Sequence, residues 1–370
     1  MGKLTKMDVI YDTGSDWLIV EGADCVNCEG NTYDISLSLQ TGTAVKTSSD
    51  IMKKEFGSAK FLGETYTDEV CLLFSACVEN FEFFYVVAQD GMEEPVDGNV
   101  GMARNEPFFF KNSSESATQK LYVEALVESD IIPVNKFSFY FTEKSEMSWV
   151  DLGEPQQDNV RFDGELIELQ MITDYFWSDF CQGVAIGDTS EENTFGWEYN
   201  DDYRRVSTMD HSIYTVFDTG STAIMVSGMY YESFVRAIFA RVEEGINWFA
   251  DDGIVYTECD ATYPSIFFMF QERWIEVRPR DYIHIVSDNT CIFLFLPNDQ
   301  PFNILGMPIF NDYYTVHDPD AGTISWAPHN ASTKDNLQPG VKPSGEQLMK
   351  LFSISNTATE EEQSEDGSAT

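Results

Sequence analysis

Apolar residues in this chain gather in short runs separated by polar turns, a pattern typical of β-strands. Two of these runs end in the same way. Residues 9–11 and residues 215–217 each lead directly into the tetrapeptide Asp-Thr-Gly-Ser, at 12–15 and at 218–221. Because Asp, Gly and Ser favour turns, each copy predicts a strand that delivers a carboxylate to a tight loop.

The spacing after each aspartate also repeats. An apolar residue followed by glycine returns at Gly101, 89 residues after Asp12 (101 − 12), and at Gly306, 88 residues after Asp218 (306 − 218). This near-equality indicates an internal duplication. Two similar halves would place both carboxylates on one pseudo-twofold axis.

Local patterning predicts a hairpin and two helices. Residues 54–70 contain two extended runs joined by Phe56-Gly57-Ser58-Ala59, which predicts a β-hairpin with a flexible tip. Residues 116–129 and 230–242 carry apolar side chains at helical spacing, so we expect one helix in each half.

Changes in composition divide the chain. Polarity rises at residues 153–159, where we expect the boundary between an N-terminal lobe (1–157) and a C-terminal lobe (158–330). Residues 331–370 are rich in Ser, Thr, Gly and Pro and end in an acidic run. This composition predicts a disordered acidic tail, with at most a short helix near residues 347–352.

The chain of 370 residues, 43% hydrophobic and 14% aromatic, is long enough for two substantial β-rich cores. Its charge is the unusual quantity: 22 Lys and Arg against 63 Asp and Glu give a net charge of −41. Such a polyanion is a poor partner for nucleic acid or an anionic membrane. Protonating carboxylates relieves the self-repulsion, so we predict a fold that tolerates acid.

The seven cysteines are odd in number, so at least one remains free if the others pair. Cys25 and Cys28 predict a local disulfide, since a zinc ribbon needs a second such pair and a thioredoxin-type site needs a following helix. Cys71 and Cys77 would share a face of a single strand but lie too far apart there to bond.

The pair Cys259 and Cys291 flanks two apolar segments and is placed to close a hairpin loop. No uninterrupted apolar run approaches the ~18 residues of a membrane span, and no signal peptide precedes Met1. We therefore expect no stable membrane insertion.

Two aspartates in contact define a particular chemistry. If Asp12 and Asp218 meet, both cannot ionise, so the pair keeps one proton over an acidic pH range. The ionised member can activate a water as general base while the other donates its proton to a carbonyl oxygen. The result is amide hydrolysis without metal, cofactor or covalent intermediate.

The residues after each aspartate have physical roles in such a pair. Gly14 and Gly220 let the backbone approach a carboxylate closely. The hydroxyls of Thr13 and Thr219 can bond across the interface, and two serines can bond the outer carboxylate oxygens. The serines are Ser15 and Ser221.

These two motifs, each after an apolar run, resemble the active-site signatures of pepsin-like aspartic proteases, and the resemblance extends to about Pro328. Residues 97–103 are similar to the first-lobe psi-loop segment of that family, and residues 303–306 to the second-lobe one. The resemblance implies a mainly β, bilobal fold with a cleft on a pseudo-twofold axis. It also implies an aspartic endopeptidase acting at acidic pH, with Asp12 and Asp218 catalytic.

The same resemblance assigns the remaining site residues. Phe56, Gly57 and Ser58 correspond to a flap and, with Thr222, to substrate binding, while Cys259 and Cys291 correspond to the second-lobe disulfide. The implied substrates are peptides or denatured proteins, and the implied protein is a monomer of the secretory pathway, in a lysosome or vacuole or outside the cell.

The flap departs from the family pattern. Family members present a tyrosine there that bonds a tryptophan seven residues after the first aspartate, and the matching residues here are Phe56 and Ile19. Because both partners are replaced together, we expect the flap to close by apolar packing, with weaker ordering and slower turnover.

The start of the chain also departs from it. Family members carry a signal peptide, a basic propeptide and further strands ahead of the first aspartate, and only residues 2–11 stand there. We therefore expect an N-terminally truncated sequence, from an incomplete gene model or a fragment. The alternative is a protein that lacks part of its central sheet.

Other interpretations have less support. Each tetrapeptide alone could be a simple turn, but two in matching contexts argue against that. A catalytically silent homologue that binds peptides is a further alternative. A glycosidase also uses two carboxylates, although nothing else resembles its usual scaffold. The four histidines are scattered, and neither GxSxG nor HExxH occurs.

Aromatic residues suggest the preference of a cleft. We expect its lining to include Phe56, Phe61, Phe176 and residues 108–110, which would suit bulky apolar side chains beside the cleaved bond.

Overall fold

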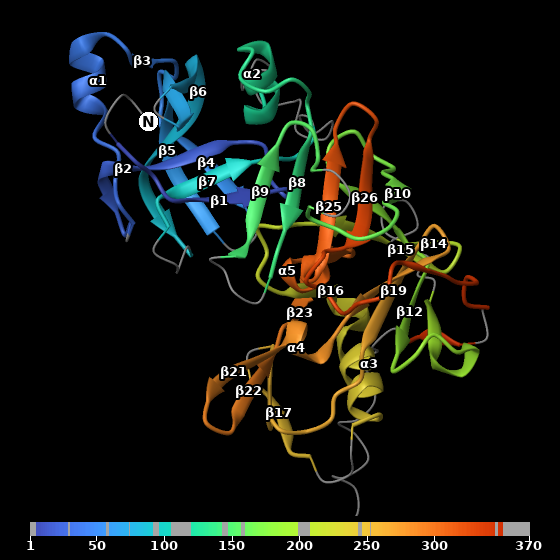
Figure 1. The fold of residues 1–370 in the computed structure, drawn as a ribbon. Helices are drawn as coiled ribbons and strands as arrows, with labels where there is room; N and C mark the ends of the chain where they lie inside the picture. Colours follow the sequence, from blue (N-terminus) through green and yellow to red (C-terminus); the bar gives the residue numbers. More distant parts are fainter. Residues whose placement is uncertain are drawn as a thin grey trace, which may run out of the picture.

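The structure is a computed structural model. It describes residues 5–28, 30–56, 59–73, 75–91, 96–104, 120–142, 147–156, 160–198, 208–242, 246–251, 253–344 and 347–350. The fold is mainly β and bilobal, with one further sheet between the sheets of the two lobes (Figure 1). This agrees with the fold predicted from the paired motifs.

The N-terminal lobe is built on a seven-stranded sheet of order β1-β7-β2-β6-β5-β3, with β4 paired to β5. Its strands are β1 (Val9–Asp12), β2 (Leu18–Val26), β3 (Val45–Lys46), β4 (Met52–Phe56), β5 (Ala59–Leu73), β6 (Ala76–Asp90) and β7 (Gly98–Gly101). Helices α1 (Ile35–Thr41) and α2 (Tyr122–Glu128) complete it. The predicted hairpin is confirmed, because β4 and β5 pair from Met52 opposite Gly63 to Phe56 opposite Ala59.

The middle sheet, of order β10-β26-β25-β8-β9, combines the two halves of the chain (Figure 1). It contains β8 (Phe137–Tyr140), β9 (Trp149–Leu152), β10 (Ile167–Gln170), β25 (Tyr313–Asp318) and β26 (Thr323–Pro328). The predicted lobe boundary falls between β9 and β10, two strands of this one sheet. We keep the division near residue 157 as a proposal, with residues 157–159 outside the described part.

The C-terminal lobe contains three further sheets, of orders β11-β15-β24-β16-β23 (with β14 on β15), β27-β20-β19-β12-β13-β28 and β17-β18-β22-β21. Their strands are β11 (Ser178–Cys181), β12 (Gly183–Ile186), β13 (Thr194–Trp197), β14 (Thr208–Met209), β15 (Ser212–Phe217), β16 (Ile224–Ser227), β17 (Trp248–Asp251), β18 (Ile254–Thr257), β19 (Ile266–Phe270), β20 (Arg273–Val277), β21 (Ile283–Ser287), β22 (Thr290–Phe293), β23 (Phe295–Asn298), β24 (Asn303–Leu305), β27 (Gln338–Pro339) and β28 (Leu348–Met349). The short helices are η3 (Glu191–Asn193), α4 (Pro279–Tyr282) and α5 (Met307–Phe310).

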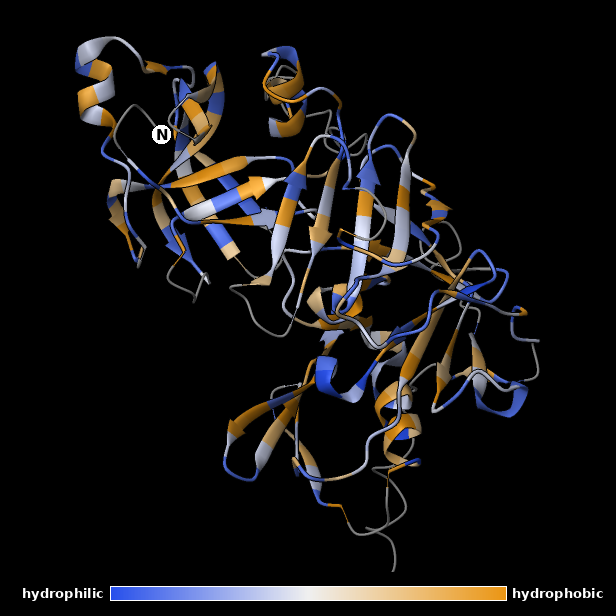
Figure 2. Cartoon of the chain, viewed as in Figure 1, coloured by the Kyte–Doolittle hydropathy of each residue, from blue (hydrophilic) through white to orange (hydrophobic). Residues whose placement is uncertain are grey.

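Both predicted helices occur, with different lengths. Helix α3 (Gly228–Phe239) buries Tyr230, Phe234, Val235 and Ile238, so its apolar stripe faces the core. Figure 2 shows hydrophobic and hydrophilic residues alternating along this helix. Helix α2 is shorter than predicted, and residues 116–119 lie outside the described part. Within that part, no helix combines the length and apolar character that a membrane span requires.

Three disulfides are present among the described residues, and Cys181 is free and buried. The predicted pairs Cys25–Cys28 and Cys259–Cys291 are confirmed. Cys71 and Cys77 also bond, because they do not lie on the single strand that would keep them apart but stand directly opposite each other on β5 and β6. The turn between these strands brings together two residues that a single strand would separate.

The segment after residue 330 also differs from its prediction. Disorder was predicted from residue 331, but residues 331–344 and 347–350 pack against the C-terminal lobe. Strand β27 pairs with β20, and β28 pairs with β13, where a short helix was predicted. Leu337 and Met349 are buried, so a few apolar residues anchor a mostly polar segment to two sheet edges. Residues 351–370 lie outside the described part.

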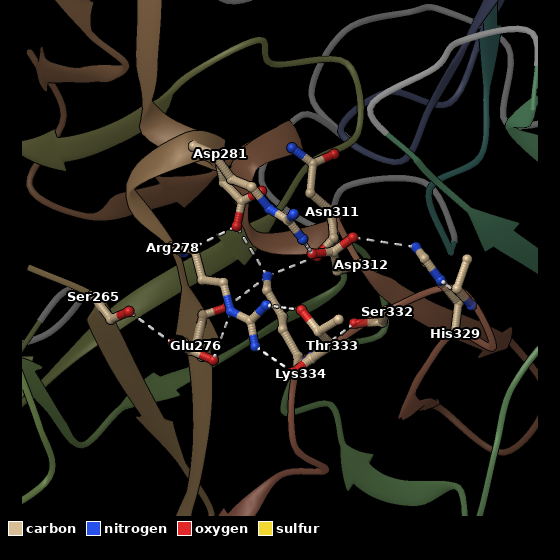
Figure 3. A network of polar contacts seen from close by, with 12 residues as sticks. Ser265, Glu276, Arg278, Asp281, Asn311, Asp312, His329, Ser332, Thr333 and Lys334 are labelled. Carbon is tan, nitrogen blue, oxygen red and sulfur yellow. Dashed lines mark hydrogen bonds and ion pairs between the residues drawn. The ribbon is translucent and has the colours of Figure 1, made fainter. Parts of the chain in front are cut away.

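Lys334 anchors this segment from inside (Figure 3). Its ammonium is fully buried, 3.1 Å from the Asp281 carboxylate, and donates to the carbonyl oxygens of Glu276 and Asn311 at 2.9 and 2.7 Å. Burial lowers the pKa of Lys334 and raises the pKa of Asp281, and the charge of each opposes that shift in the other. The ion pair thus offsets a large desolvation cost.

A second carboxylate, Asp312, extends this network (Figure 3). Arg280 pairs with it, and His329 Nε2 lies 3.4 Å from its Oδ1. Burial tends to raise the pKa of Asp312, but the bonds from His329 and Arg280 and the charge of Lys334 outweigh burial and bring it to about 2. Residues 329 and 334 are therefore held by two carboxylates of the C-terminal lobe.

His317 in β25 sits in an aromatic box. Its ring stacks on Phe137 at 4.7 Å and meets Trp177 edge-on at 4.8 Å. Neither ring nitrogen has a hydrogen-bond partner within the described part of the chain. Burial lowers the pKa of His317 to about 3. The imidazole therefore stays neutral in the folded protein at pH values where it is already protonated in the unfolded chain, whose histidine pKa is about 6.5.

We therefore expect His317→Phe to stabilise the protein in acid. A depressed histidine pKa means that stability is lost as the pH falls from about 6.5 towards about 3. The unfolding free energy of the variant relative to wild type should rise by about 2 kcal/mol between pH 8 and pH 5.

Urea unfolding across that pH range measures the difference. The exposed His284 provides the control as His284→Phe. A difference independent of pH would contradict the prediction. The same series tests the acid tolerance expected from the net charge of −41, since best stability on the alkaline side would refute it.

Candidate active site

The two Asp-Thr-Gly-Ser loops are delivered by equivalent strand arrangements. In the N-terminal lobe β1 runs parallel to β7, with Asp12 opposite Gly101. In the C-terminal lobe β15 runs parallel to β24, with Phe217 opposite Leu305. Asp12 is the last residue of β1, and Asp218 directly follows β15. The glycine that comes 89 or 88 residues later is the last residue of β7 in the first case and directly follows β24 in the second.

Reciprocal hydrogen bonds join the two loops across the lobes. The Thr13 amide donates to Thr219 Oγ1 at 3.1 Å, and the Thr219 amide donates to Thr13 Oγ1 at 2.9 Å. Each hydroxyl then donates onward, Thr13 to the Phe217 carbonyl at 3.0 Å and Thr219 to the Tyr11 carbonyl at 2.6 Å. Both threonines are buried, so these bonds fix the separation of the two carboxylates.

Each carboxylate is oriented by its own loop. The Gly14 amide donates to Asp12 Oδ1 at 2.7 Å, and the Gly220 amide donates to Asp218 Oδ1 at 2.9 Å. Serine hydroxyls donate to the Oδ2 atoms, Ser15 at 2.6 Å and Ser221 at 2.8 Å. The backbone and hydroxyl roles predicted for these residues agree with this geometry.

The glycines are required because each loop lies against the opposite carboxylate. A Cβ on Gly14 would stand 2.6 Å from Asp218 Cγ, and one on Gly220 would stand 2.3 Å from Asp12 Oδ1. No side chain fits at either position. The same distances show that Asp12 and Asp218 face each other across the lobe interface.

The pair is electrostatically coupled. Burial is the largest cause that raises the pKa of Asp218, followed by the charge of Asp12 and a hydrogen bond with it; bonds from Ser221 and the Gly220 amide act in the opposite direction. Asp218 therefore keeps its proton to a higher pH than a free aspartate does. One member can then act as a base and the other as an acid.

Some site features were not predicted. Asn99 in β7 donates through Nδ2 to Asp12 Oδ2 at 2.9 Å and to Ser15 Oγ at 2.7 Å. Trp17 supports the hairpin, since the Lys54 ammonium of β4 lies 4.0 Å from the centre of its ring. The sequence signal for the role of Asn99 is its position, two residues before the repeated Gly101.

The hairpin stands over an apolar cluster. Ile19 is buried with Phe61, Phe84 and Val86, and Met52 and Ala59 from the hairpin strands pack against them. The apolar closure expected for the flap depends on Phe56 and stays a prediction. Gly57, Ser58 and the side chain of Phe56 lie outside the described part.

The remaining predicted residues lie in different surroundings. Phe61 is only 4% exposed, so its ring belongs to this interior cluster and the prediction that it lines a cleft is wrong. Phe176 is half-buried beside Tyr175, and Thr222 is exposed next to Ser221. Residues 108–110 lie outside the described part.

The cross-lobe bonds can be tested with Thr219→Val. This change keeps the shape but leaves the buried Thr13 amide and Tyr11 carbonyl without their partner, so we expect a loss of about 2 kcal/mol in unfolding free energy. Thr219→Ser, which keeps the hydroxyl, and the exposed Thr222→Val are the controls. Urea unfolding in which all three variants match wild type would contradict the bracing role.

Comparison of the sequence with known proteins identifies a family and several relatives. Residues 3–329 match the family described as "Eukaryotic aspartyl protease". The chain is 23% identical over 337 residues to plasmepsin VI of Plasmodium berghei, covering 84% of this chain and 69% of that protein. It is 24% identical over 336 residues to the probable vacuolar protease A of Trichophyton verrucosum, covering 86% and 74%. With pepsin B of Canis lupus familiaris it shares 22% identity over 257 residues, covering 67% and 56%.

Proposed function

The chain belongs to the eukaryotic aspartyl protease family, and from this premise we propose that it is an endopeptidase that hydrolyses peptide bonds at acidic pH. The reacting water would lie between Asp12 and Asp218. The observation that carries the proposal is the reciprocal fit of the two loops, in which Gly14 leaves room only for Asp218 and Gly220 only for Asp12.

In the proposed mechanism Asp12 and Asp218 share one proton. As water attacks the carbonyl carbon, the ionised carboxylate takes a proton from the water and the protonated one gives its proton to the carbonyl oxygen. The carbon–nitrogen bond of the resulting tetrahedral intermediate then breaks. The leaving nitrogen takes a proton from the first carboxylate, and the re-forming carbonyl returns one to the second, so the pair regains its starting state.

Further proposals concern the substrates, the oligomeric state, the lobe boundary and the cellular compartment. We propose peptides or denatured proteins as substrates, a monomeric protein, and lobes that divide near residue 157. Three disulfides favour a compartment of the secretory pathway, a lysosome or vacuole, or the cell exterior. One of the relatives is named a vacuolar protease, which agrees with this placement.

Cleavage of a denatured protein across an acidic pH series, with and without pepstatin, tests the proposal. We expect new peptides, identified by mass spectrometry, that disappear with the inhibitor. Peptide binding without cleavage at any pH would instead support a catalytically silent homologue. Cleavage that pepstatin leaves untouched would point to a contaminating protease.

A further inference from the structure

One contact breaks the twofold symmetry of the candidate site. Each aspartate accepts a glycine amide on Oδ1 and a serine hydroxyl on Oδ2. Within the part of the chain that the structure describes, Asp12 alone accepts a further bond, from Asn99 Nδ2 at 2.9 Å. The asymmetry lies in a strand next to the aspartate, outside the repeated motif.

The strand register shows which residue takes this place in the other lobe. Asn99 pairs with Ile10, two residues before Asp12, on one side and with Ile19 on the other. Ile304 pairs with Val216, two residues before Asp218, and with Met225. The position that holds an amide beside Asp12 therefore holds an aliphatic side chain beside Asp218.

The side-chain amide of Asn99 directs both of its donor hydrogens towards the Asp12 carboxylate and its serine partner. Asn99 is 8% exposed, and its Nδ2 donates both to Asp12 and to Ser15 Oγ, which itself donates to Asp12. Its Oδ1 has no hydrogen-bond partner within the described part of the structure. An unpaired buried carbonyl carries a cost, which is offset where the amide nitrogen meets a charged acceptor.

We propose that Asn99 is a positioning residue that keeps Asp12 as the ionised member of the pair and leaves the proton on Asp218. This proposal rests on the proposed function. A hydrogen bond donated to a carboxylate favours its charged form, and Asp218 receives one such bond fewer. The raised pKa of Asp218 agrees with this assignment.

No nearby cation decides which of Asp12 and Asp218 is ionised among the described residues, so we infer that hydrogen bonds decide it. In the described part of the chain, Asp218 across the interface and Tyr175 from the segment before β11 interact electrostatically with Asp12, and Asp16 acts on Tyr175. Among the described residues, neither Asp12 nor Asp218 forms an ion pair with a lysine or arginine. Asn99 therefore assigns Asp12 as the base towards water and Asp218 as the acid towards the carbonyl oxygen.

The test compares Asn99→Leu and Asn99→Asp with wild type. The pH dependence of kcat/KM reports groups of the free enzyme. We expect the acidic limb to move up by about one pH unit in Asn99→Leu, because a donor to a charged group is lost. Asn99→Asp keeps the shape, and its carboxyl stays protonated beside the ionised Asp12, so it can still donate and should move the limb less than Asn99→Leu does.

Asn303→Leu is the matched control. Asn303 is fully buried one residue before Ile304, but its side chain accepts from the Ser227 amide at 2.9 Å. We expect reduced stability and an unchanged acidic limb. An acidic limb that stays unchanged in Asn99→Leu, or that moves as far in Asn303→Leu, would overturn the proposal.

Urea unfolding of the same proteins gives a readout without catalysis. The bond from Asn99 stabilises the carboxylate, so the destabilisation in Asn99→Leu should be largest at neutral pH and fade where carboxylates take up protons. If wild type cleaves nothing at any pH, the proposed function fails, and this pH dependence still decides the role of Asn99. A destabilisation independent of pH would overturn it.

Discussion

Replacing Asp218 with asparagine is expected to lower kcat/KM for peptide cleavage by about a thousandfold, within the range that general acid–base groups contribute. Asparagine keeps the shape of the side chain but cannot hold and return a proton. Asp12→Asn should have a similar effect. The double variant should be hardly worse than either single one, because the two carboxylates act as a unit.

The stability of Asp218→Asn should change in the opposite direction. The pKa of Asp218 is raised in the folded protein, so wild type loses stability as the pH rises through that folded value. Asparagine does not ionise, so the variant does not lose this stability as the pH rises. We therefore expect the inactive variant to be more stable than wild type at pH 7 and equally stable in acid, which separates lost chemistry from lost folding.

A buried carboxylate outside the site provides the control. Asp179 in β11 accepts from Gln271 Nε2 at 2.7 Å, and burial raises its pKa to about 6. Asp179→Asn should leave kcat/KM unchanged. Activity of wild-type order in Asp218→Asn, measured with a fluorogenic peptide, would refute the proposed mechanism.

Lys334→Met is expected to lower the unfolding free energy at pH 7 by about 3–5 kcal/mol. The change leaves the buried Asp281 carboxylate and two backbone carbonyls without their cationic donor. Without Lys334, burial and the charge of Asp312 raise the pKa of Asp281 with no cation to oppose them. The cost should therefore shrink as the pH falls and Asp281 takes up a proton.

Two further variants check this prediction. Lys342 pairs with the exposed Asp210 at 2.6 Å, so Lys342→Met should cost less than about 1 kcal/mol. Adding Asp281→Leu to Lys334→Met should recover much of the stability, since no unpaired charge then remains. Equal costs for the two lysine variants in urea unfolding at pH 7 would show that Lys334 is not anchored by its charge.

Features encoded in adjacent residues could be predicted from the sequence. The paired motifs located the Asp12–Asp218 pair and the bracing threonines, because strand, turn and carboxylate all lie within one short segment. Features that depend on which strands become neighbours could not. Asn99 acts through strand pairing, and Cys71 meets Cys77 because the chain reverses between β5 and β6.

Burial of charge was the other unpredicted feature. A lysine in a polar stretch indicates solvent exposure. No residue near Lys334 in the sequence indicates that its ammonium is buried against Asp281, 53 residues earlier (334 − 281). The same applies to His317, whose aromatic neighbours come from β8 and from the segment before β11.

The middle sheet pairs strands that the ribosome makes at very different times. Tyr140 of β8 pairs with Tyr314 of β25, which is made 174 residues later (314 − 140). At about 5–20 residues per second, the ribosome needs roughly 9–35 s to supply the missing partner. Throughout that interval the edge of β8 is unpaired and open to contacts with other nascent chains. The first half of the chain therefore cannot complete the middle sheet, and β8 gains its second neighbour only when β25 has emerged.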